Sequence, residues 1–134
     1  MKKVSVIFFW CLTTMLIMTC GSSRFVPSED MTKLDLQIKD YVIKPGQKLY
    51  YAAKVHASVG SAVSVSVADK TIVKIGDEIF EYDNPKNAKM PGGDAATEYY
   101  IFEGVKKGAT TIQIDEVFRG EIEASHSIKI NVVE

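Results

Sequence analysis

Apolar and polar residues alternate with a period of two along most of the chain after about its first thirty residues. This period is typical of β-strands that bury one face, whereas an amphipathic helix repeats every 3.6 residues. The clearest run contains Val63, Val65 and Val67, which are separated by serine residues. The pattern predicts a domain that is built from strands.

Seven or eight short strands are expected at roughly ten-residue spacing, which predicts an all-β, antiparallel β-sandwich. A bulge near Asp40 would explain a phase change after the first strand, and Gly76-Asp77 predicts a second bulge or tight turn. The residues or segments expected to form the strands are Leu34, Leu36 and Ile38; Tyr41 and Ile43; Leu49, Tyr51, Ala53 and Val55; Val63, Val65 and Val67; 71–82; 98–105; Ile112 and Ile114; and Ile128, Ile130 and Val132.

The connections between these strands are marked by glycine, proline and small polar residues. The longest is expected at 83–97, where asparagine, proline and glycine are concentrated, and long ordered loops are often functional. Shorter connections are expected at 58–61 and 118–121. The connections of a sandwich gather at its two ends, and successive connections alternate between these ends. The three loops are alternate connections along the chain, so they are predicted to share one end.

The first nineteen residues have the pattern of a secretory signal peptide. Lys2 and Lys3 precede an apolar run over 4–18 that is shorter than the roughly 20 residues of a membrane-spanning helix. A buried core helix is the alternative, but the basic start and the terminal position favour export. We therefore expect a signal peptide at 1–19 and an exported protein.

The end of this segment, Ile17-Met18-Thr19-Cys20, resembles a bacterial lipobox, although the family favours a smaller residue than Thr19. The resemblance implies that Cys20 is lipidated after cleavage and anchors the protein to a membrane of the cell envelope, in the periplasm or at the surface. Residues 20–32 would then be the anchor and tether, and 33–134 the folded domain. The alternative is plain secretion with a fortuitous cysteine.

Charge and cysteine content exclude several classes of function. Removal of Lys2 and Lys3 leaves 14 basic against 17 acidic side chains, a formal charge of −3, which argues against nucleic acid as a partner. The chain has two cysteines, Cys11 and Cys20, so a lipidated mature domain would have no thiol nucleophile. His56 and His126 lie in strand patterns without metal-ligand spacing. We expect no enzyme activity, no cofactor and no metal.

The second half of the chain resembles the chagasin family of cysteine-protease inhibitors. Met90-Pro91-Gly92-Gly93 is similar to the family's second loop, Gly-x-Gly-Gly, and Phe118-Arg119-Gly120 carries the aromatic and the arginine of its third loop in changed order. At the first loop, Ala57-Ser58-Val59-Gly60-Ser61 retains a small, glycine-containing tip but not the family motif Asn-Pro-Thr-Thr-Gly. The likeness covers most of the domain from about Tyr41.

The resemblance implies an immunoglobulin-like sandwich whose three loops form a wedge that fills the active-site cleft of papain-like cysteine proteases. The alternative is a non-inhibitory immunoglobulin-like surface lipoprotein module that binds a protein or glycan. The residues expected to contact a protease are Ser58, Val59, Gly60, Ser61, Pro91, Gly92, Gly93, Phe118, Arg119 and Gly120.

Overall fold

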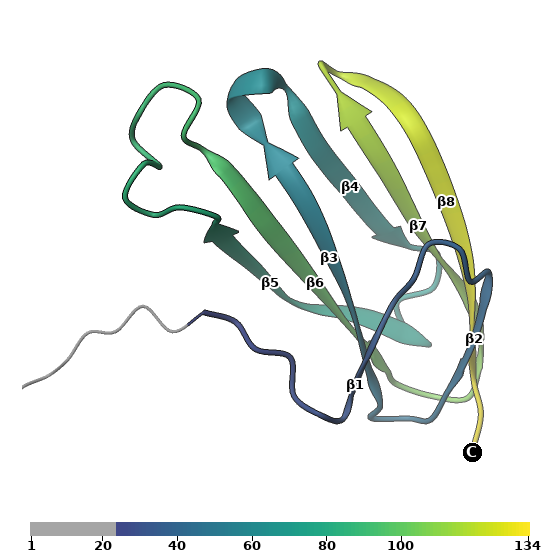
Figure 1. Ribbon diagram of the computed structural model, residues 1–134. Coiled ribbons are helices and arrows are strands. Elements are labelled where there is room, and N and C mark those ends of the chain that lie inside the picture. The colour runs from purple at the N-terminus through teal and green to yellow at the C-terminus, as the bar shows by residue number, and fades with distance from the viewer. Residues whose placement is uncertain (1–23) are drawn as a thin grey trace, which may run out of the picture.

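The computed structural model describes residues 24–134, so the predicted signal peptide and Cys20 lie outside the described residues. The described part is all-β, with one short 3-10 turn, η1, at Ala57–Val59 (Figure 1). Its strands are β1 Met31–Lys33, β2 Asp40–Ile43, β3 Lys48–His56, β4 Ser61–Val67, β5 Val73–Tyr82, β6 Ala95–Gly104, β7 Gly108–Phe118 and β8 Glu121–Val132. The count agrees with the predicted seven or eight strands.

The strands form an immunoglobulin-like sandwich in which hydrogen bonding runs in the order β2-β8-β7-β4-β3-β6-β5. The two halves of the sandwich are joined between β3 and β4 by a single registered pair, His56 with Ser61. Most neighbours are antiparallel, as predicted. The exceptions are two short pairings near the N-terminus, β1 with β3 and β2 with β8, which are parallel.

The core fills the space between the two halves of the sandwich. Alternate residues of β3 and β6 face alternate residues of β7 and β8, as the period of two predicts. Phe102 is the largest of the fully buried side chains and lies opposite Leu49 on the neighbouring strand. The other core residues with no exposed surface are Val73, Ala96, Ile112, Ile114, Ile128 and Ile130.

The strand predicted over Leu34, Leu36 and Ile38 is wrong. Leu34 is buried directly after β1, but the chain then turns, because Asp35 accepts hydrogen bonds from the amides of Gln37 and Ile38. Asp-centred turns of this kind compete with strand formation. The phase change before Tyr41 therefore comes from a turn and not from a bulge.

The second predicted bulge is confirmed, and the long loop is shorter than expected. The register between β5 and β6 shifts between Ile75 and Glu78, at Gly76-Asp77. The loop ends at Asp94, because β6 begins at Ala95 and not after Thr97.

The segment predicted as a tether contacts the domain. The ring of Phe25 lies 4.8 Å from that of Tyr99 on β6, centre to centre, and β1 begins at Met31, two residues before the predicted domain boundary. Over residues 24–134, no helix has the length and apolar character needed to cross a membrane.

Candidate binding edge formed by three loops

Three connections lie side by side at one end of the sandwich (Figure 1). They are the first loop, 57–60, between β3 and β4; the long loop, 83–94, between β5 and β6; and the hairpin tip, 118–121, between β7 and β8. We call this end the three-loop edge. The first loop lies in the middle, because it hydrogen-bonds to both of the others. The predicted convergence of these loops is thus present in the structure.

Asp94 connects the first loop to the long loop. Its carboxylate accepts hydrogen bonds from the backbone amide of Ser58 at 2.7 Å and from the Ser58 hydroxyl at 2.5 Å. His56 Nε2 lies 3.2 Å from Asp94 Oδ1 and 3.2 Å from the carbonyl oxygen of Gly92. The hydrogen bonds from Ser58 lower the pKa of Asp94, so the carboxylate is ionised at neutral pH.

Gly60 connects the first loop to the hairpin tip. Its carbonyl oxygen accepts a hydrogen bond of 2.7 Å from the backbone amide of Arg119. A Cβ at position 60 would lie 3.0 Å from Cγ of Arg119, and φ of Gly60 is +85°. Glycine is therefore needed here both for the left-handed backbone and for the close approach of the two loops.

The long loop is held by its own backbone. Successive turns place the amides of Asn87, Met90 and Gly93 within 2.8–3.0 Å of the carbonyl oxygens three residues earlier. A Cβ on Gly93 would lie 1.9 Å from the carbonyl oxygen of Asn87, so no side chain fits at this position. The long loop is therefore a preformed structure that depends on glycine.

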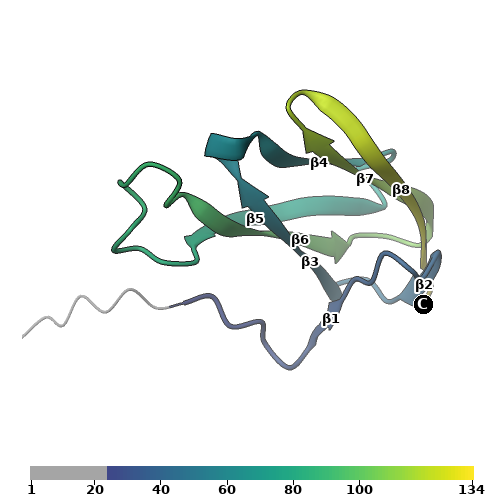
Figure 2. The same ribbon diagram turned by 45° about the horizontal axis from the view of Figure 1, so that its top comes forward.

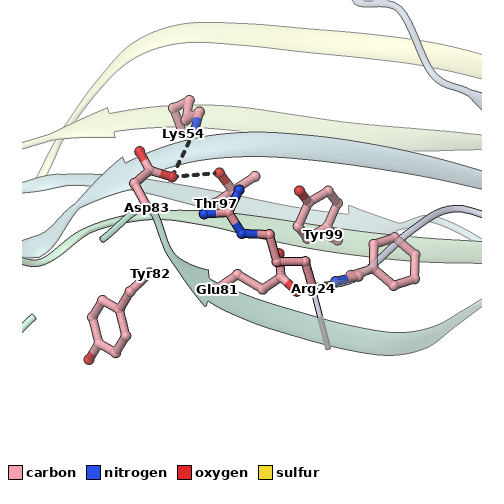
Figure 3. A pocket seen from close by; sticks show the side chains of 8 residues that line it. Arg24, Lys54, Glu81, Tyr82, Asp83, Thr97 and Tyr99 are labelled. Carbon is pink, nitrogen blue, oxygen red and sulfur yellow. Dashed lines mark hydrogen bonds and ion pairs between the residues drawn. The ribbon is translucent and has the colours of Figure 1, made fainter. Parts of the chain in front are cut away.

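The base of the long loop is fixed on the outer face of the sheet (Figure 3). The Asp83 amide donates to the Ala95 carbonyl oxygen at 2.9 Å, and the Asp83 carboxylate binds Lys54 Nζ at 2.8 Å and Thr97 Oγ1 at 3.1 Å. The hydrogen bond from Lys54 lowers the pKa of Asp83. The side chains of Lys54, Asp83 and Thr97 line an open hollow of about 320 Å³ that Arg24 also borders.

The hairpin tip is a two-residue turn. Arg119 and Gly120 both have positive φ, 51° and 88°, as a type I′ turn requires, and Phe118 pairs with Glu121. The guanidinium carbon of Arg119 lies 5.0 Å from the centre of the Phe118 ring. Phe118 is thus half-buried beneath its neighbour, whereas Arg119 is exposed.

All ten residues predicted to contact a protease lie at the three-loop edge or directly beside it. The exposed members are Ser58, Val59, Pro91, Gly92, Arg119 and Gly120, and the partly exposed ones are Gly60, Ser61, Gly93 and Phe118. Val59 is 44% exposed and is the apolar side chain of the first loop. Their role in binding a protease stays a prediction.

Two residues of this edge, Asp94 and His56, were not predicted from the sequence. Both act through contacts with residues 36 positions away in the chain, which no local pattern reveals. Met90 was also missed as a candidate contact, and at 61% exposure it is the most exposed large apolar side chain of the long loop. The sign of Met90 that the sequence offered was an apolar residue among residues that favour turns.

Two acidic side chains of β7 contact polar residues of the same strand and of β8. Asp115 accepts hydrogen bonds from Ser125 and Gln113, and Glu116 lies 3.4 Å from Nε2 of His126. Within residues 24–134, no group of three or more histidine, cysteine, aspartate or glutamate residues could hold a metal ion.

Comparisons with known proteins identify the fold. No protein-family model matches the chain, and no curated protein matches it in sequence. Among solved structures, it is similar to the cysteine protease inhibitor EhICP2 from Entamoeba histolytica, with a TM-score of 0.60 and 13% identity over 77% of this chain and 94% of that one. It is also similar to amebosin, with a TM-score of 0.58 and 15% identity over 79% of this chain and all of that one.

The likeness spans 94% of the first of these structures and all of the second. At 13–15% identity the likeness establishes the fold and leaves the activity to be tested. The resemblance predicted from the loops and turns is therefore confirmed at the level of the fold: the chain has the immunoglobulin-like sandwich of the chagasin-type inhibitors.

Proposed function

We propose that this protein inhibits papain-like cysteine proteases by inserting the three-loop edge into the active-site cleft. The observation that carries the proposal is the hydrogen bonding of the first loop to both of its neighbours, through Ser58 to Asp94 and through Gly60 to Arg119. Loops that are ordered before binding lose little conformational entropy when they dock. The inhibitor named among the structural neighbours supports the same kind of partner.

The residue types of the edge suit a narrow cleft. Gly92 and Gly120 are exposed and have no side chains, so a protease backbone can approach them closely. Arg119 supplies a forked hydrogen-bond donor, a residue type that is frequent among the strongest contacts of interfaces. No step of covalent chemistry is needed, and the protein would act as a binder and not as an enzyme.

The first loop departs from the family pattern and adapts the proposal to this chain. Val59 would take the central place that threonines occupy in the family, so an aliphatic side chain would meet the cleft nearest the catalytic cysteine. The Val59 side chain is 44% exposed, and its loop is held on both sides. We therefore expect Val59 to contribute buried apolar area in the complex.

Titration of papain with the purified domain tests the proposal. We expect inhibition that saturates at one domain per active site and is not relieved by prolonged incubation, because the domain is not cleaved. Unchanged protease activity at a large molar excess, repeated with a second papain-like enzyme, would contradict the proposal. The alternative, a surface module that binds a protein or glycan, would then be favoured.

A matched pair of variants identifies the surface. Val59→Asp places a charge at the centre of the three-loop edge, whereas Val105→Asp places it in the β6–β7 connection at the opposite end. The two valines are 44% and 45% exposed, so the expected effects on stability are similar. Only Val59→Asp should weaken inhibition, by at least about tenfold. Equal effects of the two variants on inhibition would exclude the three-loop edge as the surface that binds the protease.

We further propose that the protein is exported and anchored to an envelope membrane through a lipid on Cys20. The support is the sequence pattern that ends at this cysteine. Cys20→Ser should release the protein from the membrane fraction while leaving inhibition by the domain unchanged. Retention of the variant in the membrane fraction would refute the lipid anchor.

A further inference from the structure

A second feature lies directly beside the three-loop edge, where the two halves of the sandwich separate. It is a pocket of about 390 Å³ with mainly apolar walls, formed by residues that include Val55, Ala62, Phe80 and Val117. Gly60 and Gly120 of the first loop and hairpin tip also border it. We call it the side pocket.

One aromatic ring of β5, that of Phe80, borders the side pocket. Phe80 is 50% exposed, although it lies on the face of β5 that points between the two halves of the sandwich. Its ring packs edge-on against Tyr82, with 5.0 Å between the ring centres and 87° between the planes, and Tyr82 is 42% exposed. The face of the Phe80 ring has a negative quadrupole that attracts cations.

A carboxylate lies opposite this ring. Glu98 on β6 pairs directly with Phe80 across the two strands and also lines the side pocket. Side chains paired in this way have Cβ atoms roughly 5 Å apart, so one ligand group can touch both. Glu98 Oε2 accepts a hydrogen bond of 2.7 Å from the Tyr100 hydroxyl. Among residues 24–134, no lysine or arginine forms an ion pair with Glu98.

The second charged residue that lines the pocket is also acidic. Asp94 lines it and is bound by Ser58, while Glu78 lies two residues before Phe80 on the same strand. Burial raises the pKa of the Tyr100 hydroxyl, and the negative charges of Glu98 and Glu78 raise it further. The pocket therefore combines apolar walls, an exposed ring and the Glu98 carboxylate, which has no lysine or arginine ion-pair partner among residues 24–134.

We propose that the side pocket receives an arginine or lysine side chain of the protein that the three loops bind. Such a side chain has an aliphatic stem for the apolar walls and a cationic end for the Phe80 ring and the Glu98 carboxylate. Because the partner's identity comes from the three loops, this inference rests on the proposed function. It adds a specificity rule, since partners with a basic residue at the rim of the contact bind better.

The pocket can be tested without a protease. Nα-acetyl-arginine amide is titrated into the purified domain, with the uncharged isostere Nα-acetyl-citrulline amide as the matched ligand, and backbone amide resonances are followed by NMR. The arginine derivative should shift the amides of Phe80, Glu98 and Val117 with a millimolar dissociation constant. The citrulline derivative should bind at least about fivefold more weakly, because it cannot form the ion pair.

Two variants and one control complete the test. Glu98→Gln should weaken arginine binding about fivefold, and Phe80→Leu should do so while keeping an apolar wall, whereas Glu29→Gln, at an exposed position in the N-terminal segment, should change nothing. Equal binding of the two derivatives would show an apolar occupant and overturn the proposal. Shifts elsewhere on the domain, or no effect of either variant, would also overturn it.

The outcome for the pocket is separable from the outcome for inhibition. A domain that binds the arginine derivative but inhibits no papain-like enzyme retains the pocket and loses the proposed function. In an inhibited protease that has a basic residue at its cleft rim, Glu98→Gln should raise the inhibition constant about fivefold. Unchanged inhibition of such a protease would mean that the side pocket is not part of the contact.

Discussion

The two ends of the sandwich are built in different ways. Toward the end opposite the loops, apolar side chains from both halves interlock, and residues such as Phe102, Ile112 and Ile130 have no exposed surface. Toward the three-loop edge, the inward-facing positions include Phe80 and Glu98, and the halves separate around a pocket. The first end is held by burial of apolar surface, and the second by hydrogen bonds between distant loops.

This difference separates stability from recognition. Burial of apolar area contributes about 25 cal/mol per Å², so the closed end contributes most of the free energy of folding. The loops at the open end contribute less, but their hydrogen bonds fix the shape that a partner would meet. Substitutions at the two ends should therefore have different consequences.

The largest effect on stability is expected at the closed end. Phe102→Ala removes the largest fully buried side chain and should lower the free energy of unfolding by about 3–5 kcal/mol, as measured by urea denaturation. Inhibition by the fraction that remains folded should be unchanged. A loss of inhibition by folded Phe102→Ala protein would break the separation between the two ends.

The next largest effect is expected in the long loop. Gly93→Ala forces the Asn87 carbonyl oxygen away from a Cβ that would lie 1.9 Å from it, so the loop must rearrange. Inhibition of papain should fall by at least about tenfold with a small change in the unfolding midpoint. Gly46→Ala is the control, because a Cβ at position 46, in the turn between β2 and β3, meets open space; the φ of Gly46 is +83°. That control should lower stability by about 1 kcal/mol and leave inhibition intact.

A smaller effect is expected from the link between the first loop and the long loop. Asp94→Asn removes the charge that Ser58 binds, so hydrogen exchange of the Ser58 amide should become faster. Because the folded pKa of Asp94 is lowered below 3.8, its contribution is present above that pH and is lost as the pH falls through the folded value. Amide chemical shifts of Ser58 between pH 7 and pH 2 should follow this titration.

Asp69 supplies the control for this link. It accepts hydrogen bonds from the amide and hydroxyl of Thr71 and has a lowered pKa, but it lies in the β4–β5 connection. Asp69→Asn should leave the exchange of Ser58 and the inhibition unchanged. If Asp94→Asn and Asp69→Asn behaved alike, the link between the loops would have no special importance.

The smallest effect is expected on the outer face. Lys54 and Asp83 form an ion pair of 2.8 Å in which the two side chains are 72% and 41% exposed. Exposed pairs contribute little because water screens them. Lys54→Met should change the free energy of unfolding by less than about 1 kcal/mol, and a larger change would show that the base of the long loop is important for stability.

The sequence predicted the parts of the fold that depend on local periodicity. The alternation at Val63, Val65 and Val67 became β4, and the glycine at position 76 marked the bulge of β5. The alternation over Leu34 to Ile38 was misleading, because the turn chemistry of Asp35 was stronger than a short pattern. The three loops could be placed at one end because they are alternate connections along the chain.

The contacts that hold the candidate site could not be predicted in this way. Ser58 reaches Asp94 across 36 residues, and a sequence contains no period that reports such a distance. The side pocket depends on the pairing of Phe80 with Glu98, which is fixed by strand register after the bulge. Register is a property of the assembled sheet, so these contacts become visible only in three dimensions.

The packing of Phe25 against Tyr99 would determine how a lipid-anchored molecule is oriented at the membrane. Cys20 lies five residues before Phe25, so a lipid on Cys20 would be attached within about 18 Å of the place where the chain meets the sheet. Phe25 also contacts Glu81, near the end of β5 that leads to the long loop (Figure 2). The molecule would then lie with one flank toward the bilayer, and a large enzyme could approach its loops only from the remaining directions.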